Sequence, residues 1–324
     1  MSSIYRLPLS RKERLVSFMN ANWGSEHPLI NNPVFFEYYY VDGDMTNFYV
    51  LEEGGEIIAV CGYIPSSHEK DSDIWISIWL RKKGHNGAGL ELMGNMMALT
   101  NAKVMACNNI RQNTMPFYTF LGYHPDQLKH YYRLSDRESY MVADVAAKVI
   151  TDSEPIEGVC LEQFKDIDSI KNVFSFPEEI HPHKDLWYVE RRYFSYPYYR
   201  YMVYGIKKDG IFPALAVFRL NEGEEGNVLR LVDYIGRADD FRLLGGQIDQ
   251  LMKQFDCEYC DMYSFGVDGS LAGFTERSEN DVNIIPNYLD PLWKKNIDYY
   301  FFTSDTKDFT MFKADGDQDR KNLG

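Results

Sequence analysis

The sequence predicts an α/β protein of the α+β type, built from two similar units that are each a mixed, mostly antiparallel sheet flanked by helices. Two β-rich runs joined by a turn occur at residues 48–64 and again at 211–235, as in antiparallel hairpins. In each half a helical run and a short apolar strand come later in the same order. The length of 324 residues exceeds the roughly 250–300 residues at which a single core stops growing, which favours two domains.

Residues 10–22 predict the first helix, with Ser10 as its N-cap. A strand is expected at 73–80 and, after a glycine-rich turn, a helix at 89–100. The apolar positions at helical spacing, which we expect in the core, are Leu15, Phe18 and Met19 in the first helix and Leu90, Met93, Met96 and Met97 in the second.

The segment "NTMPFYTFLGY" (113–123) predicts a short helix. Asn113 or Thr114 can cap its start, and Pro116 suits its first turn. Gly122 stands where a helix ends in the left-handed conformation.

A strand ending near Leu134 completes the first unit. The irregular, polar stretch 135–158 then has the character of a linker. We therefore expect domains at 1–145 and 146–324.

The composition excludes several classes of protein. The net charge of -14 argues against a nucleic-acid-binding surface, because phosphate recognition needs a basic face. No apolar run reaches the roughly 18 residues of a membrane helix. Charged residues in "MSSIYRLPLSRKERLV" stand where a secretory signal would have its apolar core, so we expect a cytoplasmic protein. The sequence leaves the oligomeric state open.

The cysteines and aspartates give no metal site. The 5 cysteines are scattered, so we expect buried free thiols. Cys257 and Cys260 form one CxxC, but it lies in a strand-like run without the further ligands that zinc needs. The alternating aspartates of "DGDQDR" (315–320) resemble a calcium loop, but Arg320 replaces the turn glycine and no Glu closes the loop. This segment reads as a solvated tail or as a clasp between domains.

Aromatic residues are unusually frequent, with 24 Tyr and 20 Phe. They cluster at 35–40 and 193–204. We favour a tyrosine-rich core and domain interface; aromatic platforms for sugar rings are the alternative.

The turn "RKKGHNGAG" (81–89) separates the expected strand from the expected helix. A phosphate approaching the start of a helix needs unpaired backbone N–H groups and no side chains in the way. Gly84, Gly87, Ala88 and Gly89 provide that clearance. A plain turn without a ligand is the alternative.

This strand, turn and helix, together with "FYTFLGY" (117–123) about thirty residues later, resemble the GNAT superfamily of acyl-CoA-dependent N-acyltransferases, whose signature is F-Y-x-x-x-G-[FY]. The resemblance covers residues 1–140 and extends to 155–310 as a degenerate second copy, so it implies tandem GNAT-like domains. The tail, at 283–296 and 312–320, is similar to tandem GNAT-like proteins associated with bacterial surface-carbohydrate synthesis.

The resemblance implies that the turn binds the pyrophosphate of acetyl-CoA or another acyl-CoA as co-substrate. It also implies that the strand at 73–80 separates from a neighbouring strand just before the turn, so that its free backbone edge pairs with the pantetheine arm. Gly84 departs from the family, which has Arg or Gln at that position, and Lys82, Lys83 or His85 would have to compensate. The residues implied in cofactor binding are Trp79, Leu80, Gly84, His85, Asn86, Gly87, Ala88, Gly89 and Asn113.

By the same resemblance Tyr118 is the general acid that protonates the leaving CoA thiolate. A phenol with a pKa of about 10 stays protonated at neutral pH yet can give its proton to a thiolate. A core tyrosine is the alternative. The strand 73–80 has no Glu where many family members carry a base, which leaves Asp73, His85 or a water chain open.

In the second half the equivalent turn, at 234–246, carries two aspartates that would repel a pyrophosphate, so this copy should not bind CoA. We expect it to form part of an acceptor pocket. For Arg219 and Arg230, which lie in expected strands, we favour internal pairing with Asp233 or Asp261. The candidate acceptor residues are Arg191, Arg192, Tyr193, Arg219 and Arg230.

The function implied is transfer of an acetyl or other short acyl group from acyl-CoA to an amine of a small polar acceptor, such as an amino sugar or nucleotide sugar. A Fem-type transferase that uses aminoacyl-tRNA would keep the tandem fold, but the net charge of -14 counts against it. A non-catalytic carbohydrate-binding or scaffold protein is the other alternative, consistent with Gly84 and with the absence of an assigned base.

Overall fold

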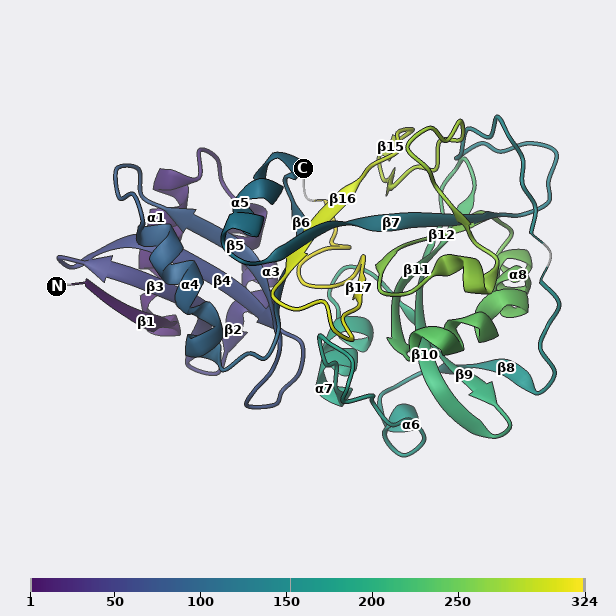
Figure 1. Ribbon diagram of the computed structural model, residues 1–324, viewed down its shortest axis with the longest axis horizontal. Helices are drawn as coiled ribbons and strands as arrows, with labels where there is room; N and C mark the ends of the chain where they lie inside the picture. Colours follow the sequence, from purple (N-terminus) through teal and green to yellow (C-terminus); the bar gives the residue numbers. More distant parts are fainter. Residues whose placement is uncertain (1, 152, 323–324) are drawn as a thin grey trace.

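One sheet runs through both halves of the computed structural model, which describes residues 2–151 and 153–322 (Figure 1). Two strand pairs in it are parallel and the others are antiparallel, as expected for the α+β class. The strands are β1 (Ser2–Pro8), β2 (Val41–Asp42), β3 (Met45–Glu53), β4 (Glu56–Pro65), β5 (Ile74–Arg81), β6 (Met105–Ile110), β7 (His124–Leu134), β8 (Val159–Phe164), β9 (Met202–Lys208), β10 (Ile211–Asn221), β11 (Asn227–Gly236), β12 (Cys257–Phe265), β13 (Thr275–Glu276), β14 (Tyr288–Leu289), β15 (Leu292–Trp293), β16 (Tyr299–Thr303) and β17 (Met311–Phe312).

The strand order is β1-β3-β4-β5-β6-β16-β7-β12-β11-β10-β9-β8, with β2, β13 and β17 attached to β3, β7 and β12. The pair β14 and β15 forms a separate small sheet. The hairpins expected at 48–64 and 211–235 are confirmed as β3–β4 and β10–β11.

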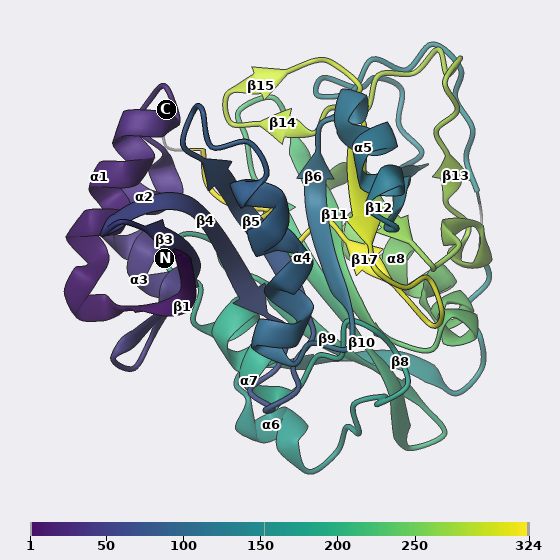
Figure 2. The same cartoon turned by 60° about the vertical axis from the view of Figure 1, so that its left-hand side comes forward.

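Helices cover both faces of the sheet in the first half. Successive residues of a strand point to opposite faces, so that on β4 Val60 packs in the core with α1, α2 and α3, whereas Cys61 packs with α4. Figure 2 shows α4 and these three helices on opposite sides of β3–β5. The helices are α1 (Lys12–Asn22), α2 (Pro28–Asn31), α3 (Pro33–Tyr40), α4 (Ala88–Thr100), α5 (Met115–Phe120), α6 (Asp168–Lys171), α7 (Leu186–Val189) and α8 (Gly245–Gln254).

Two details of the expected helices were wrong. Ser10 does not cap α1, because a 3-10 turn at Leu9–Arg11 precedes the helix and makes Arg11 its N-cap. In α4, Leu90 is 40% exposed and Leu92 is buried instead, since the helix buries the row that starts at Ala88. The other apolar positions expected in α1 and α4 lie in or against the core.

The parallel strands β5 and β6 separate soon after they meet. They pair only at Ile74–Met105 and Trp75–Ala106, whereas the other edge of β6 pairs with β16 from Ala106 to Ile110. On the other side of β5, a bulge leaves Ser77 without a partner in β4, because Gly62 pairs with Ile78 and the next residue with Ile76. Over the described residues, β5 beyond Trp75 therefore has no strand partner on its β6 side.

β7 and β16 link the two halves. Residues 124–128 of β7 pair with β16, and residues 129–134 pair with β12 (Figure 1). β16 comes from the last part of the chain and lies between β6 and β7. Each half thus completes its sheet with a strand from the other half of the sequence.

The second parallel pair, β11 and β12, also diverges, and residues 311–314 fill the space between the two strands. β17 pairs with the end of β12 at Ser264–Phe312 and Phe265–Met311. The N–H of Ala314 donates to the carbonyl of Val232 on β11. Residues 311–314 therefore bridge the two strands where they diverge.

Aromatic side chains pack between the halves, which confirms the interface interpretation. The Phe35 and Tyr198 rings are 4.8 Å apart, those of Tyr38 and Tyr196 are 5.2 Å apart, and the hydroxyls of Tyr39 and Tyr196 are 3.4 Å apart.

Residues 315–320 are a clasp and not a solvated tail. Asp315, Asp317 and Asp319 are all buried. Asp319 accepts two hydrogen bonds from Arg219, and Asp315 lies 2.7 Å from the Lys184 ammonium.

Candidate functional site

The glycine-rich turn is open at the start of α4. Gly84 and Gly87 have φ of +91° and +96°, and a Cβ at either would meet nothing within 4 Å. The N–H groups of Gly87, Gly89 and Leu90 donate to no residue in the described ranges. Unpaired N–H groups at a helix N-terminus form a ready site for an anion such as a phosphate.

The backbone explains the departure at Gly84. A φ of +91° strains any residue with a Cβ, so the Arg or Gln of the resemblance is disfavoured there. Lys82 is 2.6 Å from Glu56 and His85 is 3.7 Å from Glu53, so both have nearby carboxylates. Lys83 is exposed and has no ion pair with any described residue. Asn86 is also exposed, and its side chain is neutral. Among the three suggested substitutes, Lys83 is the one free to meet a phosphate.

Trp79 fixes the turn against the sheet. Its indole N–H donates to the carbonyl of Gly89 at 2.9 Å, and its ring stacks on Phe117 with centroids 5.8 Å apart. A Cβ on Gly89 would lie 3.3 Å from that indole nitrogen. The neighbouring Leu80 packs toward the opposite core. Both side chains thus contact the rest of the protein, so only the backbone groups of β5 are available at its free edge.

Tyr118 lies on α5, on the same face as α4. Its ring stacks on Phe302 of β16 with centroids 4.4 Å apart. Its hydroxyl has no hydrogen-bond partner in the part of the chain that the structure describes. Burial raises the pKa of Tyr118, so the hydroxyl stays protonated at neutral pH and can donate to a ligand.

The start of α5 agrees with the prediction in part. Thr114 is the N-cap residue, but its side chain makes no capping hydrogen bond, because its hydroxyl donates back to the carbonyl of Arg111 in the 3-10 turn that also contains Asn113. Asn113 is exposed. Pro116 in the first turn and the positive φ of Gly122 are confirmed.

The structure places the two suggested bases differently. Asp73 is buried at the start of β5 and accepts from the N–H groups of Val104 and His183 at 2.8 and 2.9 Å. Its other contact is the His181 ring, 2.6 Å away. Asp73 therefore joins the two halves, whereas His85 lies in the turn itself.

The three leading acceptor candidates contact the protein. Arg192 is buried and donates to the carbonyls of Ala314 and Gln318. The Tyr193 hydroxyl donates to Asp233. The Arg191 guanidinium lies 4.6 Å from the centre of the Tyr38 ring.

The strand arginines pair internally, as favoured. Arg230 forms a two-pronged contact with Asp261, at 2.7 and 2.8 Å. Arg219 pairs with Asp319 and with neither of the aspartates considered from the sequence. Asp319 was missed because it is a hundred residues further along the chain.

The turn at 234–246 is closed at three points. Asp239 and Asp240 lie in the 3-10 helix that precedes α8. A Cβ on Gly246 would be 2.8 Å from the backbone of Pro155, so the linker covers the start of α8. Residues 311–314 fill the space between β11 and β12. The start of α8 therefore has no room for a pyrophosphate.

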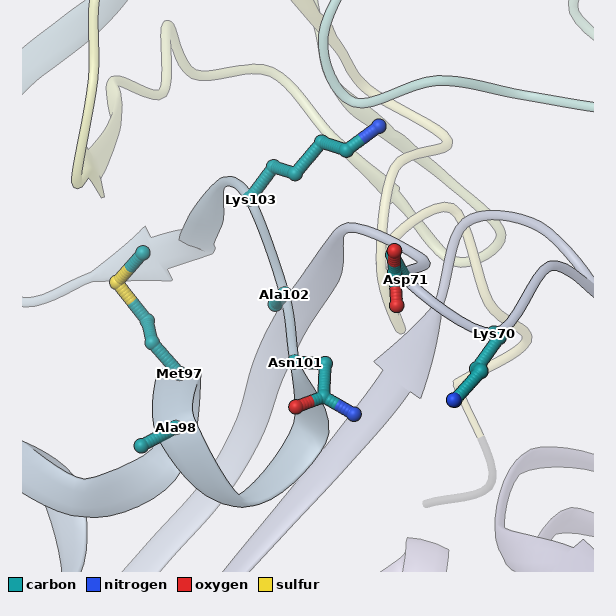
Figure 3. Close-up of a pocket in the computed structure, with 7 residues that line it drawn as sticks. All are labelled: Lys70, Asp71, Met97, Ala98, Asn101, Ala102 and Lys103. Atoms are coloured by element: carbon teal, nitrogen blue, oxygen red, sulfur yellow. The ribbon is translucent and has the colours of Figure 1, made fainter.

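A shallow hollow of about 540 Å³ lies at the far end of α4 from the glycine-rich turn (Figure 3). It is open to solvent and is separate from the site described above. The residues that line it are Lys70, Asp71, Met97, Ala98, Asn101, Ala102 and Lys103.

Metal and membrane features were searched over residues 2–151 and 153–322. No three His, Cys, Asp or Glu side chains there are grouped to hold a metal ion. No helix in these ranges is long and apolar enough to cross a membrane. All the cysteines are free, but Cys160 is exposed, because it lies on the outermost strand β8.

No family model and no curated protein matches the sequence. Solved structures match the fold. A GCN5-related N-acetyltransferase from Anabaena variabilis aligns with a TM-score of 0.55 at 10% identity, over 94% of this chain and 72% of that one. A conserved protein from Enterococcus faecalis, described as a probable N-acyltransferase, gives 0.53 at 10% identity over the same shares. The GCN5-related N-acetyltransferase from Kribbella flavida gives 0.51 at 10% identity, over 94% and 70%. The chain therefore has a GNAT-like fold.

Proposed function

We propose that the protein transfers an acetyl or other short acyl group from acyl-CoA to an amine. One observation carries this proposal: the unpaired edge of β5, the open start of α4 and the unpartnered hydroxyl of Tyr118 occur together. The solved structures that share the fold and are named as N-acetyltransferases support it.

In the proposed reaction, the pyrophosphate of CoA lies at the free N–H groups before α4 and the pantetheine arm runs along β5. A neutral amine attacks the thioester carbon, and backbone N–H groups of β5 stabilise the oxyanion. Tyr118 gives its proton to the sulfur as the C–S bond breaks.

The remaining assignments rest on the sequence. We propose a tandem organisation with the acyl-CoA site in the first domain, 1–145, and a second domain, 146–324, that supports the acceptor side. An amino sugar or nucleotide sugar is the acceptor class we propose, on the similarity of the tail to surface-carbohydrate proteins alone.

Acetyl-CoA binding is the first test. A ligand that binds only the folded state adds about 2.7 kcal/mol of stability at a hundred times its Kd. We expect a rise in Tm with acetyl-CoA that desulfo-CoA reproduces and adenosine does not. Without a shift at saturating CoA, the non-catalytic carbohydrate-binding alternative is preferred.

Tyr118→Phe tests the general acid. We expect turnover, measured by release of the CoA thiol, to fall roughly 10²-fold or more, because proton transfer by a positioned side chain contributes that much. The affinity for acetyl-CoA should change little, since the phenyl ring still packs on Phe302.

Tyr123→Phe is the matched control, because Tyr123 stacks on the same Phe302 with centroids 4.9 Å apart. It should retain normal turnover. Equal turnover in the two variants would remove the assignment of Tyr118.

A further inference from the structure

The C-terminal segment reaches the place where β5 and β6 separate. The side chain of Asn108 on β6 donates to the carbonyls of Phe312 and Asp315 at 3.1 and 3.2 Å. Gly316 lies so close to Trp75, the last residue of β5 that pairs with β6, that a Cβ would be 3.2 Å from the Trp75 Cβ. Residues 315–318 therefore run beside the divergence of the two strands.

Asp317 is the charged residue that this path brings to the strands. Burial raises the pKa of Tyr40, and the negative charge of Asp317 raises it further. The Tyr40 hydroxyl is 2.7 Å from the hydroxyl of Ser77, at the bulge of β5. Burial likewise raises the pKa of Cys107 on β6, again with a contribution from Asp317. The carboxylate thus acts electrostatically on Tyr40 of α3, which contacts β5 at Ser77, and on Cys107 of β6.

Asp317 acts on residues of both faces of the sheet, because Cys107 packs against the core that contains Tyr118 and Tyr40 packs in the opposite core. Tyr118 belongs to the core under α4 and α5, whereas Tyr40 belongs to α3 and the core on the other face. A thioester held by the turn and β5 enters from the α4 and α5 face. The amine must reach the thioester carbon from elsewhere, and the segment that carries Asp317 runs beside the place where β5 and β6 separate.

The Asp317 carboxylate can accept further hydrogen bonds. Asp317 is 7% exposed. One of its oxygens accepts from the Gln318 amide at 2.7 Å and the other from Arg320 at 2.8 Å. A carboxylate has about four lone-pair sites, so two contacts leave room for the hydrogen of an incoming ammonium.

We propose that Asp317 is the general base for the acceptor amine, an inference that rests on the proposed acyl transfer. Asp317 takes one proton from the ammonium and passes it to solvent. The neutral nitrogen forms the C–N bond, the C–S bond breaks, and the thiolate takes the proton of Tyr118. The nitrogen loses its second surplus proton, which restores Tyr118 through water, and the products are an amide and free CoA thiol.

This role places the two catalytic residues far apart in the sequence. Tyr118 comes from the first half and Asp317 from the last residues that the structure describes. A negative side chain on the acceptor side also attracts a protonated amine before the reaction. The acceptor class that fits is a small molecule whose amine is protonated at neutral pH.

The test compares two acceptors of acetyl-CoA at saturating concentration. Ethanolamine is mostly protonated at neutral pH, whereas hydroxylamine is already neutral and needs no base. Asp317→Asn should lower transfer to ethanolamine roughly 10²-fold or more, with a deficit that shrinks as rising pH deprotonates the amine. Transfer to hydroxylamine should change by only a few-fold.

Arg320→Gln is the matched control, because it breaks the ion pair with Asp317 and keeps the carboxylate. It should affect both acceptors alike and without the pH trend, and Asp317→Glu should restore part of the ethanolamine rate. The inference is wrong if Asp317→Asn lowers both rates equally at every pH, or neither, or if wild-type protein that binds acetyl-CoA acylates neither amine. Wild-type protein that fails to bind acetyl-CoA contradicts the proposed function itself.

Discussion

Lys313 is the buried residue whose charge state the fold changes most clearly within the physiological range. Its amine donates to the Tyr299 hydroxyl at 3.1 Å and lies 4.2 Å from the centre of that ring. It forms no ion pair with a carboxylate in the described ranges. Burial and the charges of Arg230 and Arg219 lower the pKa of Lys313 to about 7.

This shift predicts the pH dependence of stability. Between pH 7 and about 10 the unfolded chain keeps a proton on Lys313 that the folded protein has lost, so stability rises with pH by up to about 1.4 kcal/mol per unit. Lys313→Met should remove this slope. Urea unfolding at several pH values measures it, and equal slopes in the two proteins would contradict the prediction.

Residue-level predictions from the sequence succeeded where the signal was local. Arg230 and Asp261 pair across two neighbouring strands, as favoured. The partner of Arg219 was missed, since a contact between residues 219 and 319 leaves no local pattern. The stacking of Phe302 under Tyr118 was missed for the same reason.

At the scale of elements, the start of α4 depends on glycine. Gly87 is the N-cap at φ +96°, a conformation that costs a residue with a Cβ about 1–2 kcal/mol. Gly87→Ala should therefore lower the free energy of unfolding by about that amount. It should also weaken acetyl-CoA binding, because the turn must shift to relieve the strain.

Gly94 provides the control within the same helix. It is exposed in the middle of α4, its φ is helical and a Cβ there would meet nothing within 4 Å. Gly94→Ala should raise stability by about 1 kcal/mol and leave acetyl-CoA binding unchanged. Urea unfolding measures the free energy of unfolding and thermal shift measures acetyl-CoA binding. If Gly87→Ala and Gly94→Ala change both quantities in the same way, the special role of Gly87 is refuted.

Most elements near the site were foreseen because each has a local signal: β5 and α4 by their apolar spacing, and the end of α5 by Gly122. Ser10 was wrong as the cap of α1, and Thr114 is the N-cap of α5 without a side-chain capping bond, because 3-10 turns precede both helices and a sequence does not show where such a turn gives way to a helix. From the sequence, Asp317 was considered only as part of a possible calcium loop. Its place beside β5 depends on the path of the whole chain.

At the scale of the molecule, we expect that the two halves of the sequence do not fold independently. β16 stands between β6 and β7, and the second part of β7 pairs with β12. Residues 1–145 expressed alone would lack β16 and leave both neighbouring strand edges unpaired. We expect this fragment to show no cooperative unfolding transition.

Restoring one strand provides the comparison. The same fragment with residues 297–305 joined by a flexible linker should regain part of the transition, because β16 can again pair with β6 and β7. Circular dichroism against temperature measures both fragments. A cooperative transition in residues 1–145 alone would show that the missing strand is dispensable.

The exchange of strands also constrains how the protein is made. β16 and β17 occupy residues 299–312, and β16 pairs with β6 and β7, which are synthesised much earlier. Pairing over such separations is slow, and a sheet waiting for its strands exposes edges that attract other chains. On the ribosome, neither half can close its sheet until residues 299–312 have emerged. The emergence of residues 299–312 therefore ends a long period of vulnerability to aggregation, in which a chaperone would have most effect.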